Sequence, residues 1–387
     1  MKKEFLLNPD ITFLNHGSFG ATPIPVFNKY QEWQRVMEFQ PVEFLSRKAP
    51  KLLEHAREIL GKFLGTSKNN LVYVTNTTTG INIIARSLKL GPGDHVLTTD
   101  HEYGAMDRVW RFLSSQRHFK YTRQPVTIPL TSKEKIIDEI WQGVSPSTKV
   151  IYFSHISSPT AITFPVKEIC ERAKKEGIIT IVDGAHAPGQ IDLNLDELQA
   201  DFYAGNLHKW LCAPKGTAFL FARPEMQFLI DPLIIGWGWD PSLPTESHFV
   251  SYLEHNGTRD ISAFLTVPEA LNFYYSNNIS FYRKECHSLT SKTNKELSSL
   301  TNIPSIYNED DSWFGQMAST ILPQQVDPDH LKSFLYDDYH IEIPLIRWNG
   351  LILIRYSFHI YNCKQDAEVL MNALSEYLTT HAEGKRL

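Results

Sequence analysis

The sequence predicts an α/β protein with a mostly parallel sheet, followed by a smaller α+β lobe. Through the middle of the chain, short β-branched or aromatic runs alternate with amphipathic stretches of helical length. Strands that alternate with helices in this way form sheets that are covered on both faces. After about residue 265 this alternation gives way to helical segments and shorter strands. A chain of 387 residues is long enough to divide into more than one lobe.

Strands of the sheet are expected where apolar runs are bounded by turn residues. They are 71–75, 95–99, 150–156, 178–184, 201–205 and 217–224. The segments 80–90 and 166–177 have the spacing of amphipathic helices. In the second lobe we expect helices at 267–277, 281–300 and 365–378, with strands near 318–323 and 351–358.

The first twenty residues are expected to cross over and pack near the second lobe. The predicted division is therefore a large domain of residues 21–265 and a small domain made of residues 1–20 and 266–387.

Composition excludes several classes of function. A net charge of −5 without a Lys/Arg stripe argues against nucleic acid as a partner. The four cysteines have no paired spacing, which argues against a disulfide framework and a structural zinc site, and we expect no metal. The N-terminal apolar run is too short for a secretory signal, and no stretch is long enough to span a bilayer. A reducing cytoplasm is the expected location.

Asp183 and Lys209 follow two predicted strands and define the candidate site. Because strand ends of a parallel sheet meet along one edge, the sheet can bring the two side chains together. A lysine in a cleft loses hydration, which lowers its pKa and makes it a nucleophile. A carboxylate beneath a pyridine nitrogen lets the ring act as an electron sink. Each residue also has an ordinary explanation: Asp183 could cap a helix, and Lys209 could be a solvated surface lysine. Together they predict a pyridoxal 5'-phosphate site.

The segment 75–80, Thr-Asn-Thr-Thr-Thr-Gly, leads directly into a predicted helix. Hydroxyl groups and unpaired backbone N–H groups at a helix start suit a phosphate, although ordinary helix capping explains them equally well. Asn206 and His208 could reach the same phosphate from the lysine loop.

Seven motifs in register make the chain resemble the class V aminotransferase group of fold-type-I pyridoxal-phosphate enzymes. They lie at 13–20, 75–82, 100–110, 183–190, 205–216, 256–260 and 355–362. Within that group the chain is most similar to isopenicillin N epimerase-like proteins. The resemblance implies a large domain with a mostly parallel seven-stranded sheet and a smaller α+β C-terminal domain.

The resemblance assigns the residues around the cofactor ring. It makes Lys209 the lysine that holds the cofactor covalently, Asp183 the partner of the pyridine nitrogen, and His186 the contact of the phenolic oxygen. Tyr103 stands where the related cysteine desulfurases stack a histidine on the ring. We expect it both to bind the cofactor and to act in catalysis, with His101 as an alternative second base.

The resemblance assigns another group of residues to the cofactor phosphate. The resemblance implies that Thr78 and the backbone of Thr79 hold it, with Asn206 and His208 assisting. Thr258 matches a residue that reaches the phosphate from a second subunit. This match implies a homodimer with shared active sites.

Arg355 matches the arginine that clamps the α-carboxylate of an amino-acid substrate, a bidentate contact that suits a guanidinium. Asn15 and His16 are counted with it as substrate-binding residues. The segment 339–347 contains no cysteine, whereas a desulfurase needs a persulfide-forming thiolate there. Sulfur transfer through an enzyme persulfide is therefore disfavoured.

The favoured function is epimerisation or racemisation at the α-carbon of an amino acid. The alternatives are a C–S β-lyase acting on a sulfur amino acid and a class V aminotransferase, because fold and cofactor do not fix the reaction. A non-catalytic binding protein of the same fold is the third possibility. The side chain of the substrate is not determined by the sequence.

Overall fold

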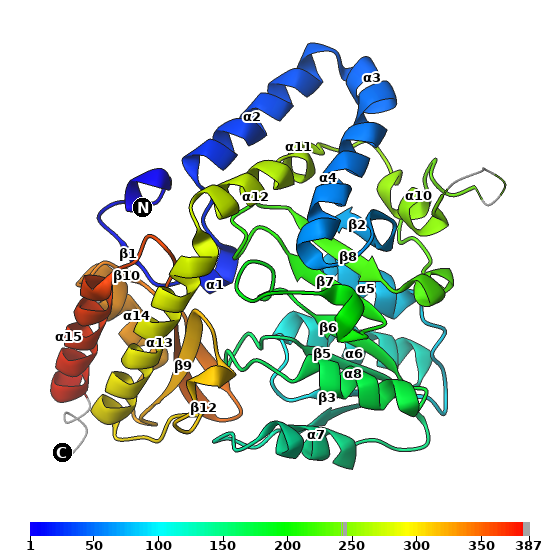
Figure 1. Cartoon of the computed structure of the whole chain (residues 1–387). Coiled ribbons are helices and arrows are strands. Elements are labelled where there is room, and N and C mark those ends of the chain that lie inside the picture. The colour runs from blue at the N-terminus through cyan, green and yellow to red at the C-terminus, as the bar shows by residue number, and fades with distance from the viewer. Residues whose placement is uncertain (241, 243–245, 382–387) are drawn as a thin grey trace.

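The protein, described here from a computed structural model that covers residues 1–240, 242 and 246–381, is built around a seven-stranded sheet in the order β2-β8-β7-β6-β5-β3-β4 (Figure 1). β8 pairs antiparallel with both neighbours, and the other pairs are parallel. The strands are β2 Leu71–Val74, β3 His95–Thr99, β4 Lys120–Gln124, β5 Thr148–Ser154, β6 Ile179–Asp183, β7 Phe202–Asn206 and β8 Ala218–Ala222. The mostly parallel seven-stranded sheet is confirmed.

The central strands are apolar along their whole length because both faces of the sheet are covered. In β5, Val150 and Tyr152 belong to the core on one face, and Ile151 and Phe153 to the core on the other. All four side chains are fully buried. Successive side chains of a strand point to opposite faces, so a continuous apolar run is what a two-sided core requires.

Helices cover both faces of the sheet. α5 Thr77–Ser87, α6 Gly104–Arg117 and α10 His248–Glu254 pack on one face, while α4 Ala49–Leu64, α7 Lys133–Gln142 and α8 Val166–Lys175 pack on the other. The remaining helices of this part are α2 Ile24–Phe39, α3 Pro41–Glu43, α9 Leu195–Leu198, α11 Ser262–Leu265 and α12 Val267–Ser276. Figure 1 shows α2, α11 and α12 together above the sheet.

Each of the six predicted strands corresponds to a strand of the sheet, and only β4 was missed. The sequence of β4 is polar and none of its residues is buried, because the strand lies at the edge of the sheet. α5 begins three residues before the predicted helix because the Asn76 side chain accepts a hydrogen bond from the N–H of Thr79 and so caps the earlier turn.

The C-terminal part forms a three-stranded antiparallel sheet in the order β11-β12-β9. Its elements are α13 Ile279–Thr301, β9 Met317–Leu322, α14 Pro328–Asp337, β10 Ile341–Glu342, β11 Leu345–Trp348, β12 Leu351–Ser357 and α15 Lys364–His381. α14, β10 and β11 were not predicted. The two short strands lie in a segment broken by Pro344, which hides their pattern.

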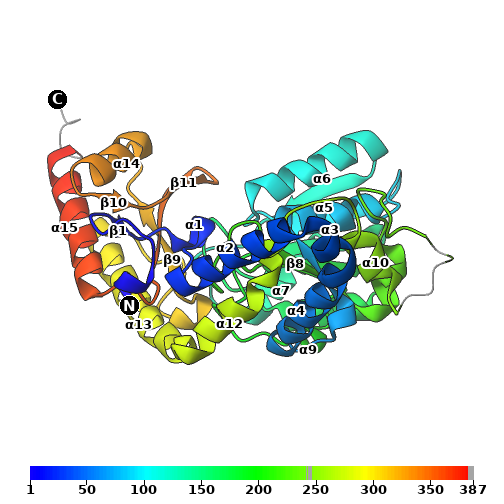
Figure 2. The same ribbon diagram turned by 90° about the horizontal axis from the view of Figure 1, so that it is seen from above.

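The N-terminal segment lies beside these C-terminal elements (Figure 2). β1, Thr12–Phe13, pairs in parallel with β10, and the N–H of Ser357 donates to the carbonyl of Leu14. The short helix α1, His16–Phe19, follows at once. The boundaries 21–265 and 1–20 with 266–387 stay a prediction. Among the residues that the structure describes, no helix has both the length and the apolar character needed to cross a membrane.

Candidate active site

A cavity of about 450 Å³ lies where β5, β6 and β7 end, and this size is typical of small-molecule sites. Ser154, Asp183 and Asn206 are the last residues of these strands, and all three line the cavity. The start of α5, the lysine loop after β7, α1 and β12 complete the wall. The position at the carboxyl edge of the sheet is the one expected for such folds.

The structure brings eight of the predicted site residues to this cavity. They are Thr78, Tyr103, Asp183, His186, Asn206, His208, Lys209 and Arg355. Four others do not line it: Asn15, His16, Thr79 and Thr258.

Asp183 is almost completely buried and held by two donors. The N–H of Ala185 donates to its Oδ1 at 2.9 Å, and the hydroxyl of Tyr152 donates to its Oδ2 at 3.0 Å. Burial raises the pKa of the Asp183 carboxyl, and the two hydrogen bonds and the nearby Lys209 oppose the rise. A buried carboxylate in this position is stabilised by any cation that enters the cavity, and a protonated pyridine nitrogen is such a cation.

Lys209 carries an amine that is close to neutrality at physiological pH. Loss of hydration, with the positive charge of Arg355 as a second cause, lowers its pKa to about 7, although Asp183 opposes the shift. An amine that is partly neutral can attack a carbonyl carbon. Gly20 allows this loop to pack closely, because a Cβ there would lie 2.8 Å from the Cα of Lys209 and its φ is +69°.

His186 has its tautomer set by Trp210, a residue that the sequence did not single out. The indole N–H of Trp210 donates to Nδ1 of His186 at 3.3 Å, and an indole nitrogen can only donate. Burial holds the pKa of His186 well below its usual value. The neutral ring therefore carries its hydrogen on Nε2, which lies 3.1 Å from Nζ of Lys209. This N–H can donate to an oxygen atom in the cavity.

The first turn of α5 forms the opposite end of the cavity. Asn206 accepts the N–H of Thr77 through Oδ1 at 2.9 Å, which leaves its Nδ2 free for another acceptor. Thr78 lines the cavity and stands at a helix start, where backbone N–H groups lack intrahelical partners and the dipole attracts anions. The N–H of Thr79 already donates to the Asn76 side chain at 2.8 Å, so this predicted phosphate donor is occupied.

His208 needs a proton before it can bind a phosphate. Its Nδ1 lies 2.9 Å from the carbonyl of Thr217, an acceptor, so Nδ1 carries the hydrogen. Burial lowers the pKa of His208 to about 4, which leaves Nε2 as an acceptor in the neutral ring. A phosphate dianion beside the ring would raise this pKa again and convert Nε2 into a donor.

Arg355 is a buried cation without a carboxylate partner among the described residues. Its Nη1 donates to the carbonyl of Ser158 at 2.5 Å and to the Ser158 hydroxyl at 3.0 Å, and its Nη2 donates to the hydroxyl of Ser18 at 3.2 Å. Loss of hydration lowers its pKa to about 10, so it stays charged. A buried unpaired charge is destabilising until an anion binds it.

Ser18 and Ser158 were missed by the sequence analysis. Ser158 could have been found, because it follows the end of β5 in the same way that the predicted residues follow their strands. Ser18 is oriented by Asn15, whose Oδ1 accepts the Ser18 hydroxyl at 2.5 Å while its Nδ2 donates to Glu342 at 3.0 Å. The structure therefore places Asn15 one residue behind the cavity wall.

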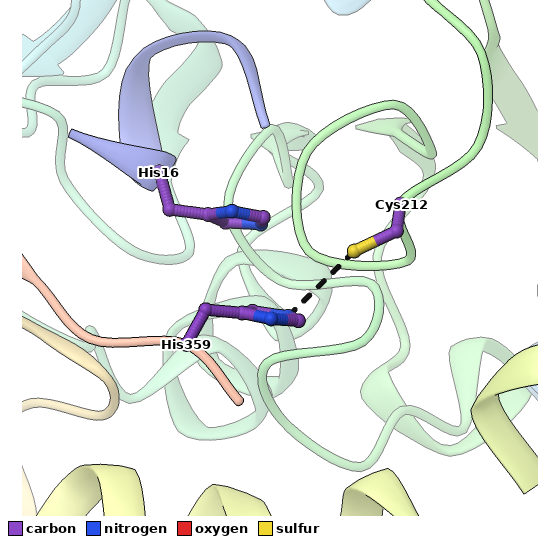
Figure 3. A group of neighbouring side chains, drawn as sticks. All are labelled: His16, Cys212 and His359. Carbon is purple, nitrogen blue, oxygen red and sulfur yellow. Dashed lines mark hydrogen bonds between the residues drawn. The ribbon is translucent and has the colours of Figure 1, made fainter. Parts of the chain in front are cut away.

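His16 packs against the lysine loop, close to Cys212 of that loop and to His359 (Figure 3). Its Nε2 lies 3.0 Å from the carbonyl of Lys209 and its Nδ1 lies 2.8 Å from the hydroxyl of Tyr361. The carbonyl fixes the hydrogen on Nε2, and the tyrosine then donates to Nδ1. Although the three ligand atoms lie within 4.8 Å of one another, His16 has no lone pair left for a metal. Its imidazole holds the backbone of Lys209 in place through this hydrogen bond.

Tyr103 and His101 differ in access. Tyr103 is 49% exposed and lines the cavity. His101 is completely buried, and its two nitrogens lie 2.8 Å from the Thr160 hydroxyl and 3.0 Å from the carbonyl of Val126. The structure does not bring His101 to the cavity, which leaves Tyr103 as the candidate for a second base.

Thr258 lies on the surface after α10, away from the cavity of its own chain. Its predicted contact with the phosphate of a second subunit stays a prediction.

The cavity fits pyridoxal 5'-phosphate at each point where the residues can be compared with the cofactor's groups. Asp183 suits the pyridine nitrogen, the Nε2–H of His186 suits a ring oxygen, and the start of α5 with Asn206 suits the phosphate. Lys209 supplies an amine for the aldehyde.

Comparisons with known proteins agree with this fit. The isopenicillin N epimerase of Amycolatopsis lactamdurans is 34% identical, with 97% of each chain covered. An L-cysteine desulfhydrase-like protein of Epichloe uncinata is 30% identical over 70% of this chain and 65% of its own. The structure of a cysteine desulfurase from Thermococcus onnurineus NA1 has a TM-score of 0.82 at 23% identity, covering 98% of this chain and 97% of that one.

The fold is thus that of fold-type-I enzymes. The model of the family described as aminotransferase class-V matches residues 21–370, which is most of the chain. The chain belongs to the class V aminotransferase family of pyridoxal 5'-phosphate enzymes.

Proposed function

We propose that this enzyme epimerises or racemises an amino-acid substrate at its α-carbon. The observation that carries the proposal is the position of the buried, unpaired Arg355 in the same cavity as the near-neutral Lys209. The guanidinium suits an α-carboxylate, and the amine suits the α-proton of the same substrate. Similarity to an isopenicillin N epimerase over nearly the full chain supports this reaction.

The chain's own residues divide the work. The cofactor, when bound, withdraws electrons from the α-carbon and so acidifies its proton. Lys209 would hold the α-proton at Nζ on one face of the substrate. Asp183 would pair with the pyridine nitrogen of the cofactor, and His186 would donate to a ring oxygen through Nε2. Tyr103, on the exposed side of the cavity, is proposed to return a proton to the other face through its hydroxyl.

A C–S β-lyase is the second candidate, and the similarity to a desulfhydrase-like protein favours it over a transaminase. A desulfurase that works through an enzyme persulfide is less well supported. The segment where its thiolate would lie contains β10 and β11, which pair with β1 and β12, and it contains no cysteine. Cys212 is a buried residue of the lysine loop, and burial raises the pKa of its thiol to about 12, so it does not supply a thiolate.

We also propose a homodimer in which Thr258 reaches the partner's phosphate site. Large apolar side chains on both sides of Gly236, which packs against Asn256, are exposed, with Trp237 at 96% and Ile235 at 64%. An exposed apolar group of this size is typical of a protein interface. A cytoplasmic location is proposed because all four cysteines are free thiols.

The test is incubation of the holoenzyme with a panel of L- and D-amino acids in heavy water. Deuterium at the α-carbon with inverted configuration is the expected result. Keto acid with ammonia or sulfide would instead establish a lyase, and accumulation of the amine form of the cofactor would establish a transaminase. A protein that binds the cofactor but exchanges no α-proton with any amino acid would refute all three reactions.

Tyr103→Phe separates the two-base form of the proposal from a one-base form. The variant keeps the ring for stacking and removes the hydroxyl. We expect α-deuteration to continue through Lys209 while inversion slows by about a hundredfold, the usual contribution of a positioned general acid. Inversion at the wild-type rate would mean that Tyr103 only stacks on the ring.

A further inference from the structure

A second cavity, of about 510 Å³, adjoins the first. Tyr103, Ser158 and Arg355 line both cavities, so they form the boundary between them. Whatever Arg355 binds therefore stands at the entrance to the second cavity. The proposed reaction at the α-carbon makes no use of this space.

The turn of the β11–β12 hairpin borders this cavity and is hydrogen-bonded to Asp100, on the loop after β3. Asn349 and Gly350 have φ values of 46° and 79°, as a tight two-residue hairpin turn requires. The indole N–H of Trp348 donates to the carbonyl of Asp100 at 2.8 Å, and the side-chain amide of Asn349 donates to Oδ2 of Asp100 at 2.6 Å. These contacts join the C-terminal sheet to the loop after β3 and give the cavity a fixed wall.

The carboxylates that line this cavity are already engaged. Asp100 accepts the N–H of Val126 at 3.0 Å in addition to the Asn349 amide. Asp107 accepts the Tyr121 hydroxyl at 3.0 Å. A third acid in the wall, Glu102, has a pKa that burial raises to about 8, so it is largely protonated at neutral pH.

Apart from Arg355, which is assigned to the α-carboxylate, Arg123 is the lining cation with the weaker carboxylate pairing. Its nearest carboxylate contact is Asp107, with 3.9 Å between Nε and Oδ1, and its Nη2 donates to the carbonyl of Asp100 at 3.3 Å. Its side chain is 36% exposed, enough to reach a ligand. Arg347, another lining cation, is paired with Asp329 at 3.0 Å and lies mostly in solvent.

We propose that the second cavity takes the side chain of the substrate and that Arg123 binds a carboxylate at its far end. The substrate class is then an amino acid with a second, distal carboxylate, or a larger molecule that carries such a group. This inference rests on the proposed function, because it takes the α-carboxylate to be the anion on Arg355.

The first test measures binding without chemistry. Glutarate, adipate and pimelate carry two carboxylates but no amine, so they cannot react with the cofactor. Calorimetric titration of the holoenzyme should show that one length binds at least tenfold more tightly than the monocarboxylate of equal chain length, since a charge-assisted hydrogen bond contributes this much. Arg123→Gln should abolish the difference. Arg111→Gln is the matched control, because Arg111 pairs with the same Asp107 at 2.9 Å but lies outside the cavity.

The second test measures α-proton exchange in heavy water with dicarboxylic amino acids of increasing length and with their apolar counterparts of equal length. We expect kcat/KM to favour one dicarboxylic acid, and Arg123→Gln to lose this preference mainly through KM. Exchange with equal efficiency for both series would overturn the inference and leave the proposed function standing. Dicarboxylate-selective binding that depends on Arg123, without exchange of any α-proton, would refute the proposed function and keep the inference. Equal binding of mono- and dicarboxylates would overturn the inference by itself.

Discussion

The clearest quantitative prediction concerns the pH at which Lys209 captures the cofactor. Capture requires the neutral amine, whose pKa is lowered to about 7 by loss of hydration and by Arg355. Roughly 9% of such an amine is neutral at pH 6 and roughly 91% at pH 8, whereas an ordinary lysine would be only about 0.3% neutral at pH 8. The capture rate should therefore rise about tenfold from pH 6 to pH 8 and then level off.

The assay follows the visible absorbance of the cofactor after it is mixed with the apo-protein over a series of pH values. Nα-acetyllysine, measured in parallel, removes the titration of the cofactor itself, and Lys209→Ala measures reaction with other lysines. Arg355→Gln should move the midpoint to higher pH because it removes a positive neighbour. Asp183→Asn should move it to lower pH because it removes a negative one. A rate that keeps rising tenfold per pH unit beyond pH 8 would show an ordinary amine and refute the reasoning.

The remaining predictions concern single side chains. Trp210→Phe should free the tautomer of His186 and shift the absorbance maximum of the bound cofactor, and an unchanged spectrum together with unchanged kcat would mean that the indole only packs. Asp183→Asn should keep the cofactor bound but lower kcat by at least about a hundredfold, because the amide does not stabilise a protonated pyridine; kcat within a factor of two or so of wild type would contradict the assignment. Glu254 is buried against Arg57 at 2.8 Å, and burial raises its pKa to about 7. Since the folded-state pKa lies above the unfolded one, Glu254 contributes stability below pH 4.5 that is lost as pH rises through 7, a fall of about 3 kcal/mol. Urea unfolding should show this fall in the wild type and not in Glu254→Gln, and parallel pH profiles would contradict it.

Much of the fold could be predicted because the core strands show their burial in the sequence. β5 and β6 are apolar on both faces, so each forms a continuous apolar run that predicts a buried strand. β4 could not be found in this way, since an exposed edge strand needs no apolar run. The antiparallel direction of β8 also could not be predicted, because its apolar sequence is equally compatible with either direction.

The candidate site also contains residues that the sequence could predict and residues that it could not. Residues at strand ends, such as Asp183, could be placed because the sheet itself brings them to one edge. The partners of Arg355 could not, because Ser18 and Ser158 meet it from positions 337 and 197 residues away. Tautomers are a further example. Trp210 places the hydrogen of His186 on Nε2 by donating to Nδ1, and no sequence pattern reveals this hydrogen bond.

The charges of the cavity explain why these residues need one another. Burial lowers the pKa of the Arg355 guanidinium and of the Lys209 amine, and it raises the pKa of the Asp183 carboxyl. Burial therefore opposes the charged form of each of the three groups. A ligand that brings a cationic ring nitrogen opposite Asp183, with anions at the start of α5 and at Arg355, stabilises the charged forms of Asp183 and Arg355. The cavity is therefore complementary in charge to a cofactor and an amino acid together.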